Sequence, residues 1–293
     1  MSGLLHPATG DASDRVASTT ALSAAGLRAT HLLVDHPPPI LDDPLALRLL
    51  DPAVGRTIRD HPDRSGTPAA RTLRAEVVVR SRYAEDRLAD AVRSGVGQLV
   101  ILGAGLDTFA YRQPAWAAKL HIIEVDHAAS QRDKQARLRR AGIAPPKNVS
   151  YASADLESDA LPPRLAAAGM DAGRPAFLAC LGVLIYLSEA AADAIVAMAA
   201  NLPAGSEFVF TFSRPDGSTA GAPVPGSPAA RVAAVGEPWR TRFEPDVLAR
   251  RLRAAGFRSV SLLSAADLTE RYLRERTDGL RMPARVVIAD AMV

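Results

Sequence analysis

The chain has 293 residues, of which 48% are hydrophobic and 23% are charged, an ordinary composition for a globular protein with one large α/β domain. Its 35 Lys and Arg nearly balance its 32 Asp and Glu, so the formal charge of +3 does not indicate a nucleic-acid partner. The single cysteine, Cys180, excludes an intrachain disulfide and a cysteine-based metal cluster, and we expect no bound metal.

The start of the chain and its hydropathy give an expectation about location. Residues 1–14 are polar and acidic and lack the apolar core of a signal peptide, so we expect a disordered tail. No window approaches the ~20 consecutive apolar residues that a membrane helix needs. We therefore expect a soluble, cytoplasmic protein with no membrane or nucleic-acid partner. The sequence leaves its oligomeric state open.

Residues 15–95 are predicted to form a helical N-terminal extension that caps the rest of the protein. Apolar residues follow helical spacing from Val16 to Val34, and the prolines after His36 end that helix. A short helix begins at Pro44, and a longer one covers Leu73–Ser94. Between them, residues 60–68 have the composition of a polar loop.

Residues 96–293 are predicted to form an α/β core in which short apolar strands alternate with helices. Continuous apolar runs are typical of strands that are covered on both faces. The predicted strands are Leu99–Leu102, His121–Asp126, Asn148–Ala152, Pro175–Leu181, Glu207–Phe212, Phe257–Leu263 and Arg285–Ala291. They predict a Rossmann-like, seven-stranded, mostly parallel sheet with helices on both faces. Residues 214–237, rich in Gly, Pro and Ser, are predicted to be a lid-like insertion.

A glycine-rich turn follows the first predicted strand. Gly103-Ala104-Gly105 lets the backbone come close to a ligand at the carboxyl edge of the sheet, where open α/β sheets bind nucleotides. Asp126 ends the second strand, where a carboxylate can accept both hydroxyls of a ribose. Glu124 is the alternative for this role, because alternate strand residues share a face.

Two further positions narrow the choice of nucleotide. Asp155 ends the third predicted strand and can accept a hydrogen bond from an adenine amino group, while Leu156 packs on the ring; Asp155 has an equally good interpretation as a helix N-cap. Thr108 stands where the dinucleotide fingerprint requires a third glycine. A pyrophosphate needs that close approach and a mononucleoside does not, which favours S-adenosylmethionine over NAD.

The ten residues Gly103–Arg112 closely resemble the GAGLDTRxYR signature of the leucine carboxyl methyltransferase family, in particular the bacterial branch of class I S-adenosylmethionine-dependent O-methyltransferases. Looser similarities occur in the same order along the chain, at Thr20-Ala21, Arg28–His31, Ile40–Pro44, Arg80–Tyr83, Glu124–Asp126, Leu181–Leu187 and Gly236–Trp239. The resemblance implies the cofactor S-adenosyl-L-methionine, with S-adenosyl-L-homocysteine as product.

The resemblance also implies roles for individual residues. Arg80 would pair with the methionine carboxylate of the cofactor, with Arg82 as the rival for this role. Gly103, Ala104 and Gly105 would line the methionine and the ribose, Asp126 would hold the ribose, and Asp155 with Leu156 would hold the adenine.

The sequence departs from the family pattern at two positions. Phe109 replaces the arginine that usually follows Asp-Thr in the signature, which removes a charge beside the cofactor turn. Leu181 stands where eukaryotic members carry a glutamate, so any contact made by that carboxylate is absent.

The methyl acceptor is less defined than the donor. A carboxylate acceptor is ionised at neutral pH and needs no general base, whereas a hydroxyl acceptor profits from one. The candidates for a base are His31, Tyr186 and Glu237, although His31 and Tyr186 also suit structural roles. Candidates for the wall of an acceptor pocket are Tyr111, Leu181, Tyr186 and Trp239.

The sequence thus predicts an O-methyltransferase that acts on a carboxylate or hydroxyl of a small molecule, such as a secondary metabolite. Three alternatives remain open at this point: a methyltransferase that acts on the C-terminal carboxyl group of a protein, an NAD-binding oxidoreductase, and a protein that binds the cofactor without catalysis.

Overall fold

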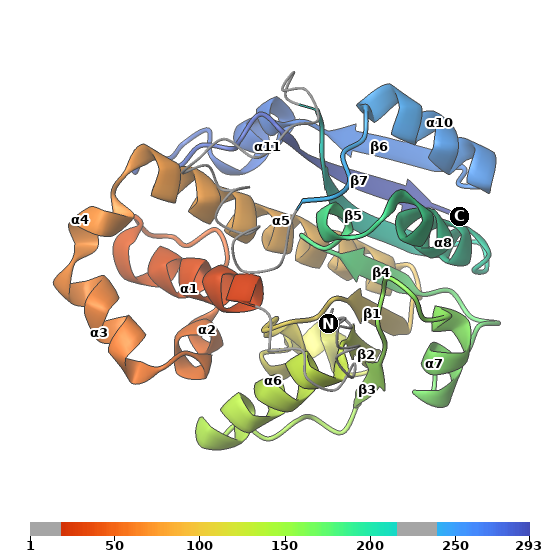
Figure 1. Cartoon of the computed structure of the whole chain (residues 1–293), viewed down its shortest axis with the longest axis horizontal. Helices are drawn as coiled ribbons and strands as arrows, with labels where there is room; N and C mark the ends of the chain where they lie inside the picture. Colours follow the sequence, from red (N-terminus) through yellow and green to blue (C-terminus); the bar gives the residue numbers. More distant parts are fainter. Residues whose placement is uncertain (1–18, 216–238) are drawn as a thin grey trace, which may run out of the picture.

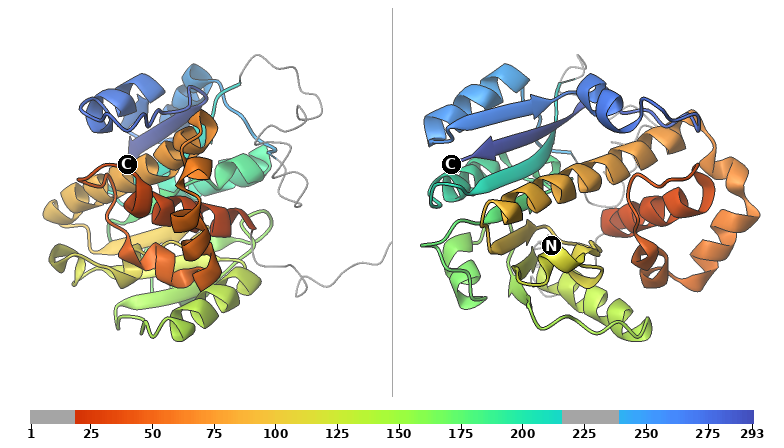
Figure 2. Two further views of the ribbon diagram at one scale, coloured as in Figure 1. Left: turned by 90° about the vertical axis from the view of Figure 1, so that its left-hand side faces the viewer. Right: turned by 180° about the vertical axis from the view of Figure 1, so that it is seen from behind.

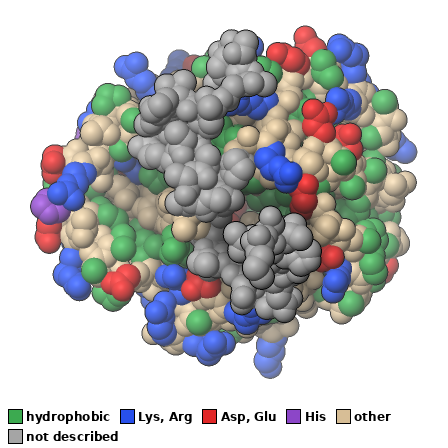
Figure 3. Space-filling view, in the orientation of Figure 1, with side chains coloured by type: hydrophobic (Ala, Val, Ile, Leu, Met, Phe, Trp, Pro, Cys, Tyr) green, Lys and Arg blue, Asp and Glu red, His purple; other side chains and the backbone are tan. Residues whose placement is uncertain are grey.

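The structure, a computed structural model, describes residues 19–215 and 239–293. The predicted tail over residues 1–14 and nearly all of the predicted lid over residues 214–237 lie outside the described residues. In the described part, no helix is long and apolar enough to cross a membrane. Lys and Arg side chains and Asp and Glu side chains both occur over the face seen in Figure 3.

A seven-stranded sheet forms the centre of the molecule, with strand order β3-β2-β1-β4-β5-β7-β6. β1 to β5 pair with one another in parallel, and β7 is antiparallel to both β5 and β6. This confirms the predicted mostly parallel α/β sheet. The strands are β1 (Gln98–Leu102), β2 (His121–Asp126), β3 (Val149–Ser153), β4 (Phe177–Cys180), β5 (Glu207–Ser213), β6 (Ser259–Leu263) and β7 (Val286–Met292).

Helices cover both faces of this sheet. Alternate residues of β1 enter two separate cores, Val100 and Leu102 on one face and Leu99 and Ile101 on the other. The first core contains residues of α7 (Leu161–Ala167), α8 (Glu189–Ala200) and α10 (Pro245–Ala255). The second contains residues of α5 (Pro68–Arg93) and α11 (Ala265–Tyr272), and Figure 2 shows α5 running across this face. α6 (Ala128–Arg140) follows β2.

From residue 19 onward, four further helices precede α5 and lie together at one end of the molecule (Figure 1). They are α1 (Thr19–Val34), α2 (Pro44–Leu49), α3 (Pro52–Asp60) and α4 (Pro62–Ser65). The predicted loop over residues 60–68 was therefore wrong in part. Proline occupies the first turn of α3, α4 and α5, and Asp51 and Thr67 cap α3 and α5 by accepting backbone hydrogen bonds. The prolines in this segment, which made its composition resemble that of a loop, instead stand in the first turns of helices.

Ion pairs join these N-terminal helices to the loop after β1. Arg28 of α1 bonds through Nε to Asp43 Oδ2 at 2.7 Å and donates through Nη2 to the carbonyl of Leu106 at 2.6 Å. Arg112 bonds the α5 carboxylate of Glu85, with Nη1 3.1 Å from Oε2. Asp43 is fully buried and also caps α2, so its ion pair with Arg28 fixes the position of α2.

A second buried ion pair holds β2 to α6. Glu124 and Lys134 are almost completely buried, with Nζ 2.8 Å from Oε1. Burial raises the pKa of Glu124, and the Lys134 ammonium opposes that shift. Tyr111 also donates to Glu124 Oε2 at 3.0 Å, so the carboxylate has two partners.

Removing one member of this pair leaves the other charge buried without compensation. We expect Lys134→Met to lower the free energy of unfolding by about 3–5 kcal/mol, measured by urea denaturation. Adding Glu124→Gln to the same chain should recover part of that loss, because no uncompensated charge remains. The exposed Lys147→Met is the matched control and should change stability by less than about 0.5 kcal/mol. A Lys134→Met variant as stable as this control would contradict the expectation.

Candidate functional site

A cavity of about 1530 Å³ opens at the carboxyl edge of the sheet, between the ends of β1, β2 and β4 and the helices α1 and α5. Ligand pockets for one small molecule commonly measure about 300–1,000 Å³. The volume of this cavity therefore exceeds the usual volume of a pocket for one small ligand. Apolar side chains line its part between α1 and α5, including Ala24, Leu27, Leu73 and Val77.

The glycine turn after β1 forms one wall of this cavity. Gly103 has φ +66°, and a Cβ there would lie 2.4 Å from a methyl carbon of Val183. The loop after β4 therefore packs directly on the backbone of the turn, which only glycine permits. Ala104 donates its N–H to the carbonyl of Val125 at 3.0 Å, which ties the turn to the end of β2.

Asp126 lies at the other end of the turn and faces the cavity. Its Oδ2 accepts the N–H of Gly105 at 2.5 Å, and its Oδ1 accepts the N–H of His127 at 2.7 Å. Burial raises the pKa of Asp126, and these two backbone donors oppose the shift. A carboxylate oxygen has more than one lone-pair site, so Asp126 can still accept hydroxyl groups of a ligand.

Arg80 reaches the cavity from α5, and Arg82 does not. The Arg80 side chain is 15% exposed and lies against the loop after β4, where a Cβ on Gly182 would be 2.6 Å from its Nη1. Burial lowers the pKa of Arg80, with Glu76 at 3.8 Å opposing the shift. The Arg82 side chain is 46% exposed and pairs with Asp86 at 2.7 Å. Of the two predicted rivals, Arg80 lines this cavity and Arg82 does not.

Asp155 and Leu156 both line the cavity beyond the end of β3. Asp155 Oδ1 accepts the N–H of Glu157 at 3.0 Å, so it stabilises the local turn. It is not the N-cap of α7, because that helix begins at Leu161 and Ala160 holds the cap position. The helix-cap interpretation of Asp155 is therefore wrong.

Three of the residues predicted for an acceptor pocket line the cavity: Leu181, Tyr186 and Trp239. Beside Trp239 lie Glu76 and Arg285, which the sequence analysis did not identify. Arg285 donates from Nη2 to Glu76 Oε2 at 2.7 Å, and its guanidinium carbon lies 5.1 Å from the centroid of the Trp239 ring. Arg28, within one of the segments compared to the family, also lines the cavity.

Tyr111 does not belong to an acceptor wall, contrary to the prediction. It is absent from the cavity lining and bonds the buried Glu124 and the hydroxyl of Tyr151, each at 3.0 Å. Burial and the nearby Glu124 carboxylate raise the pKa of Tyr111 above its usual value. The tyrosine of the signature therefore stabilises the sheet behind the turn.

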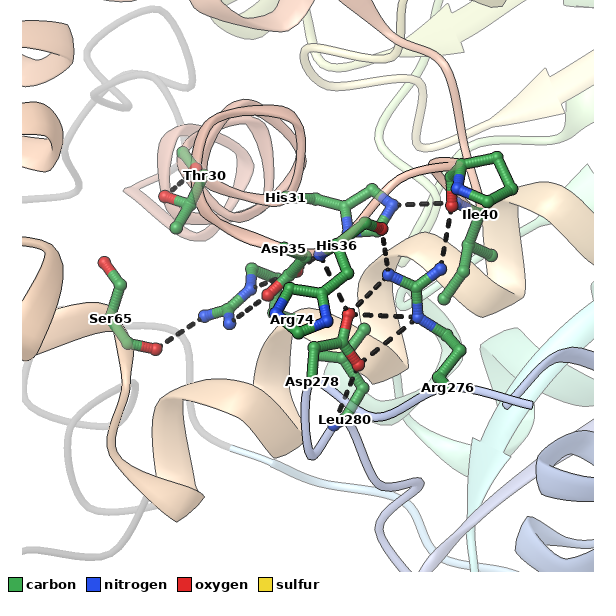
Figure 4. A network of polar contacts seen from close by, with 12 residues as sticks. Thr30, His31, Asp35, His36, Ile40, Ser65, Arg74, Arg276, Asp278 and Leu280 are labelled. Carbon is green, nitrogen blue, oxygen red and sulfur yellow. Dashed lines mark hydrogen bonds and ion pairs between the residues drawn. The ribbon is translucent and has the colours of Figure 1, made fainter. Parts of the chain in front are cut away.

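His31 is a structural residue rather than a base (Figure 4). It is buried outside the cavity lining, with Nε2 accepting the N–H of Ile40 at 2.9 Å and Nδ1 2.8 Å from Asp35 Oδ2. Because Nε2 accepts a hydrogen bond, Nδ1 carries the proton of the neutral ring. No lone pair of the ring is then left to take a proton from a methyl acceptor. Glu237, the third candidate, lies outside the described residues.

No group of three or more His, Cys, Asp and Glu side chains within residues 19–215 and 239–293 has the arrangement of a metal site. Cys180 is fully buried, and burial raises the pKa of its thiol to about 12. The charged side chains that line the cavity include the guanidinium groups of Arg28, Arg80 and Arg285 and the carboxylates of Glu76 and Asp126, which suit a charged organic ligand.

Comparisons with known proteins give a consistent picture. A family model described as leucine carboxyl methyltransferase matches residues 21–200. A protein of Frankia alni, named as a candidate S-adenosyl-L-methionine-dependent methyltransferase, is 31% identical over 268 residues, which cover 88% of this chain and 83% of that protein. A protein of Mycolicibacterium vanbaalenii with the same kind of name is 36% identical over 190 residues, and the match spans 61% of each chain.

Two crystal structures share the fold at low sequence identity. A candidate methyltransferase from Thermobifida fusca is similar with a TM-score of 0.53 and 17% identity, covering 92% of this chain and 93% of that one. A DUF574 family protein from Streptomyces avermitilis gives a TM-score of 0.52 and 16% identity, covering 96% and 99%. At this identity the similarity concerns the fold alone.

The contact between Gly182 and Arg80 makes a prediction about side-chain size. Gly182 has φ +72°, so Gly182→Ala introduces backbone strain and pushes on the Arg80 guanidinium. We expect the variant to lose about 1–2 kcal/mol of unfolding free energy in a denaturant titration. Gly26→Ala is the control, because its Cβ meets nothing within 4 Å in the helix α1, and it should be neutral or stabilise by up to about 1 kcal/mol. Equal effects at both sites would refute this account of Gly182.

Proposed function

The chain belongs to the leucine carboxyl methyltransferase family, and we propose that it transfers a methyl group to a carboxylate or hydroxyl oxygen of a small molecule, such as a secondary metabolite. Its cofactor is S-adenosyl-L-methionine, as in the relatives whose names state it. Family membership therefore favours a methyltransferase over an NAD-binding oxidoreductase, in agreement with Thr108 at the position of the third fingerprint glycine.

One observation carries the proposal. One cavity is lined by the Arg80 guanidinium, which lies against Gly182 in the loop that packs on the glycine turn, and by the Asp126 carboxylate, which is bonded to that turn. Arg80 would bind the carboxylate of the methionine moiety with two parallel hydrogen bonds. Asp126 would accept the ribose hydroxyls, and Asp155 with Leu156 would hold the adenine. The residues present therefore fit the charges and polar groups of the cofactor.

When bound, S-adenosyl-L-methionine supplies a methyl group on a sulfonium sulfur, and this sulfur leaves readily as the neutral thioether of S-adenosyl-L-homocysteine. The main task of the protein is then to align the acceptor oxygen with that methyl group. Alignment of this kind can contribute about 7–11 kcal/mol to lowering a barrier. Val183, packed on Gly103, and Tyr186, two residues before the N-cap of α8, border the space in which we place the acceptor.

A carboxylate acceptor requires no base, because it is ionised at neutral pH. A hydroxyl acceptor would need a proton acceptor, and of the two candidates among the described residues, Tyr186 lines the cavity and His31 does not. His31 is occupied by Asp35 and Ile40 and does not take part. We propose Leu181, Tyr186 and Trp239 as the acceptor wall.

Cofactor affinity tests the assignment of Arg80 most simply. We expect the protein to bind S-adenosyl-L-methionine and S-adenosyl-L-homocysteine in isothermal titration, and Arg80→Gln to bind both about 10–100-fold more weakly. Arg82→Gln serves as the matched control on the same helix and should retain the affinity. If a folded sample binds neither compound, the proposed function fails; if Arg82→Gln shows the larger loss, the assignment of Arg80 fails.

The destination of the methyl group tests the acceptor class. We expect radioactive methyl groups from the cofactor to appear in the solvent extract of a bacterial lysate rather than in its protein fraction. Label that is released by mild alkali indicates an ester and therefore a carboxylate acceptor, and stable label indicates an ether. Label confined to protein would contradict a small-molecule acceptor and would support methylation of a protein.

A further inference from the structure

Arg285 is a cavity residue that the proposed cofactor contacts do not use. It lies in the turn just before β7 and lines the cavity. In the strand order, β4 and β5 separate β7 from β1, so Arg285 and the glycine turn after β1 come from different parts of the sheet. Glu76 accepts from its Nη2, and the Trp239 ring lies against the guanidinium. These two contacts hold the side chain, which is 20% exposed, in one place.

One hydrogen-bond donor of Arg285 is left unsatisfied. Within residues 19–215 and 239–293, its Nε is the one buried side-chain nitrogen or oxygen without a hydrogen-bond partner. This nitrogen is itself buried, so a ligand in the cavity would meet the other donors of the guanidinium. A guanidinium is a rigid, planar set of five donors, and the structure pairs one of its nitrogens, Nη2, with Glu76.

We propose that Arg285 recognises an acidic group of the methyl acceptor and so determines acceptor specificity. This inference rests on the proposed function. Arg80, one turn along α5 from Glu76, lies against Gly182 next to the glycine turn, so it is placed for the cofactor. Arg285 and Trp239 line the same cavity, and Glu76 pairs with both arginines, so Arg285 is left for the second ligand that the proposed reaction requires.

The arrangement gives each of the three residues a definite task. Trp239 covers one face of the guanidinium and keeps it from turning away. Glu76 lies between the two arginines, 3.8 Å from Arg80 and 2.7 Å from Arg285, and prevents them from repelling each other. A carboxylate on the acceptor would accept from the remaining donors of Arg285, whereas an uncharged amide of the same shape would form weaker bonds.

Matched acids and amides test this inference on the full chain saturated with S-adenosyl-L-homocysteine. The probes are 4-phenylbutyrate, decanoate and benzoate, each compared with its primary amide, with affinities from ligand-observed NMR titration. We expect at least one acid to bind about 10–100-fold more tightly than its amide. Arg285→Gln should abolish that preference while the affinity for S-adenosyl-L-homocysteine stays within about twofold. The exposed Arg253→Gln is the control and should retain the preference.

Each other outcome has a definite meaning. Equal binding of acid and amide, binding of none of the probes, or a preference that survives in Arg285→Gln would overturn the role of Arg285. Failure to bind S-adenosyl-L-homocysteine would instead contradict the proposed function. If Arg285→Gln does not fold, Arg285→Lys keeps the charge and loses the planar donor set, and it should reduce the preference without abolishing it.

Discussion

The site depends on a close approach of backbone and side chains at the carboxyl edge of the sheet. β1 and β4 are neighbours at the centre of the sheet, so the loops that follow them meet. At Gly103 the turn is covered by Val183, and at Gly182 the next loop is covered by Arg80; neither position has space for a Cβ. These two contacts bring a buried cation to within reach of the glycine turn and thereby define where a cofactor carboxylate would lie.

The N-terminal helices are part of the same construction. Arg28 of α1 holds both the buried Asp43 and the carbonyl of Leu106, so α1 and α2 are fixed to the loop after β1. Arg112 fixes the same loop to Glu85 of α5. The second half of the family signature therefore anchors the cofactor loop, while its two glycines allow Val183 and Ala21 to pack closely on the turn. The wall of the cavity formed by α1 and α5 owes its position to these ion pairs.

The sequence predicted the features that arise from local patterns. All seven strands were expected close to their positions, because each is a short apolar run between turn residues. The strand order could not be derived from these runs, and neither could the short helices α3, α7 and α11. Tyr111 and Arg285 bond side chains that are distant in the sequence, Tyr151 at 40 positions and Glu76 at 209. Periodicity and spacing carry no information about such pairs. His31 has near partners, Asp35 and Ile40, but the sequence does not show that they occupy both nitrogens of its ring.

In the proposed site, the glycine turn, Arg80 and Asp126 together bind the methyl donor. A crystal structure of the full chain with S-adenosyl-L-homocysteine would show whether they do. We expect the homocysteine carboxylate on the Arg80 guanidinium, the ribose hydroxyls on Asp126 and the adenine beside Leu156, with the space next to Trp239 left free. A homocysteine carboxylate bound to Arg285 instead, or a ribose remote from Asp126, would contradict it.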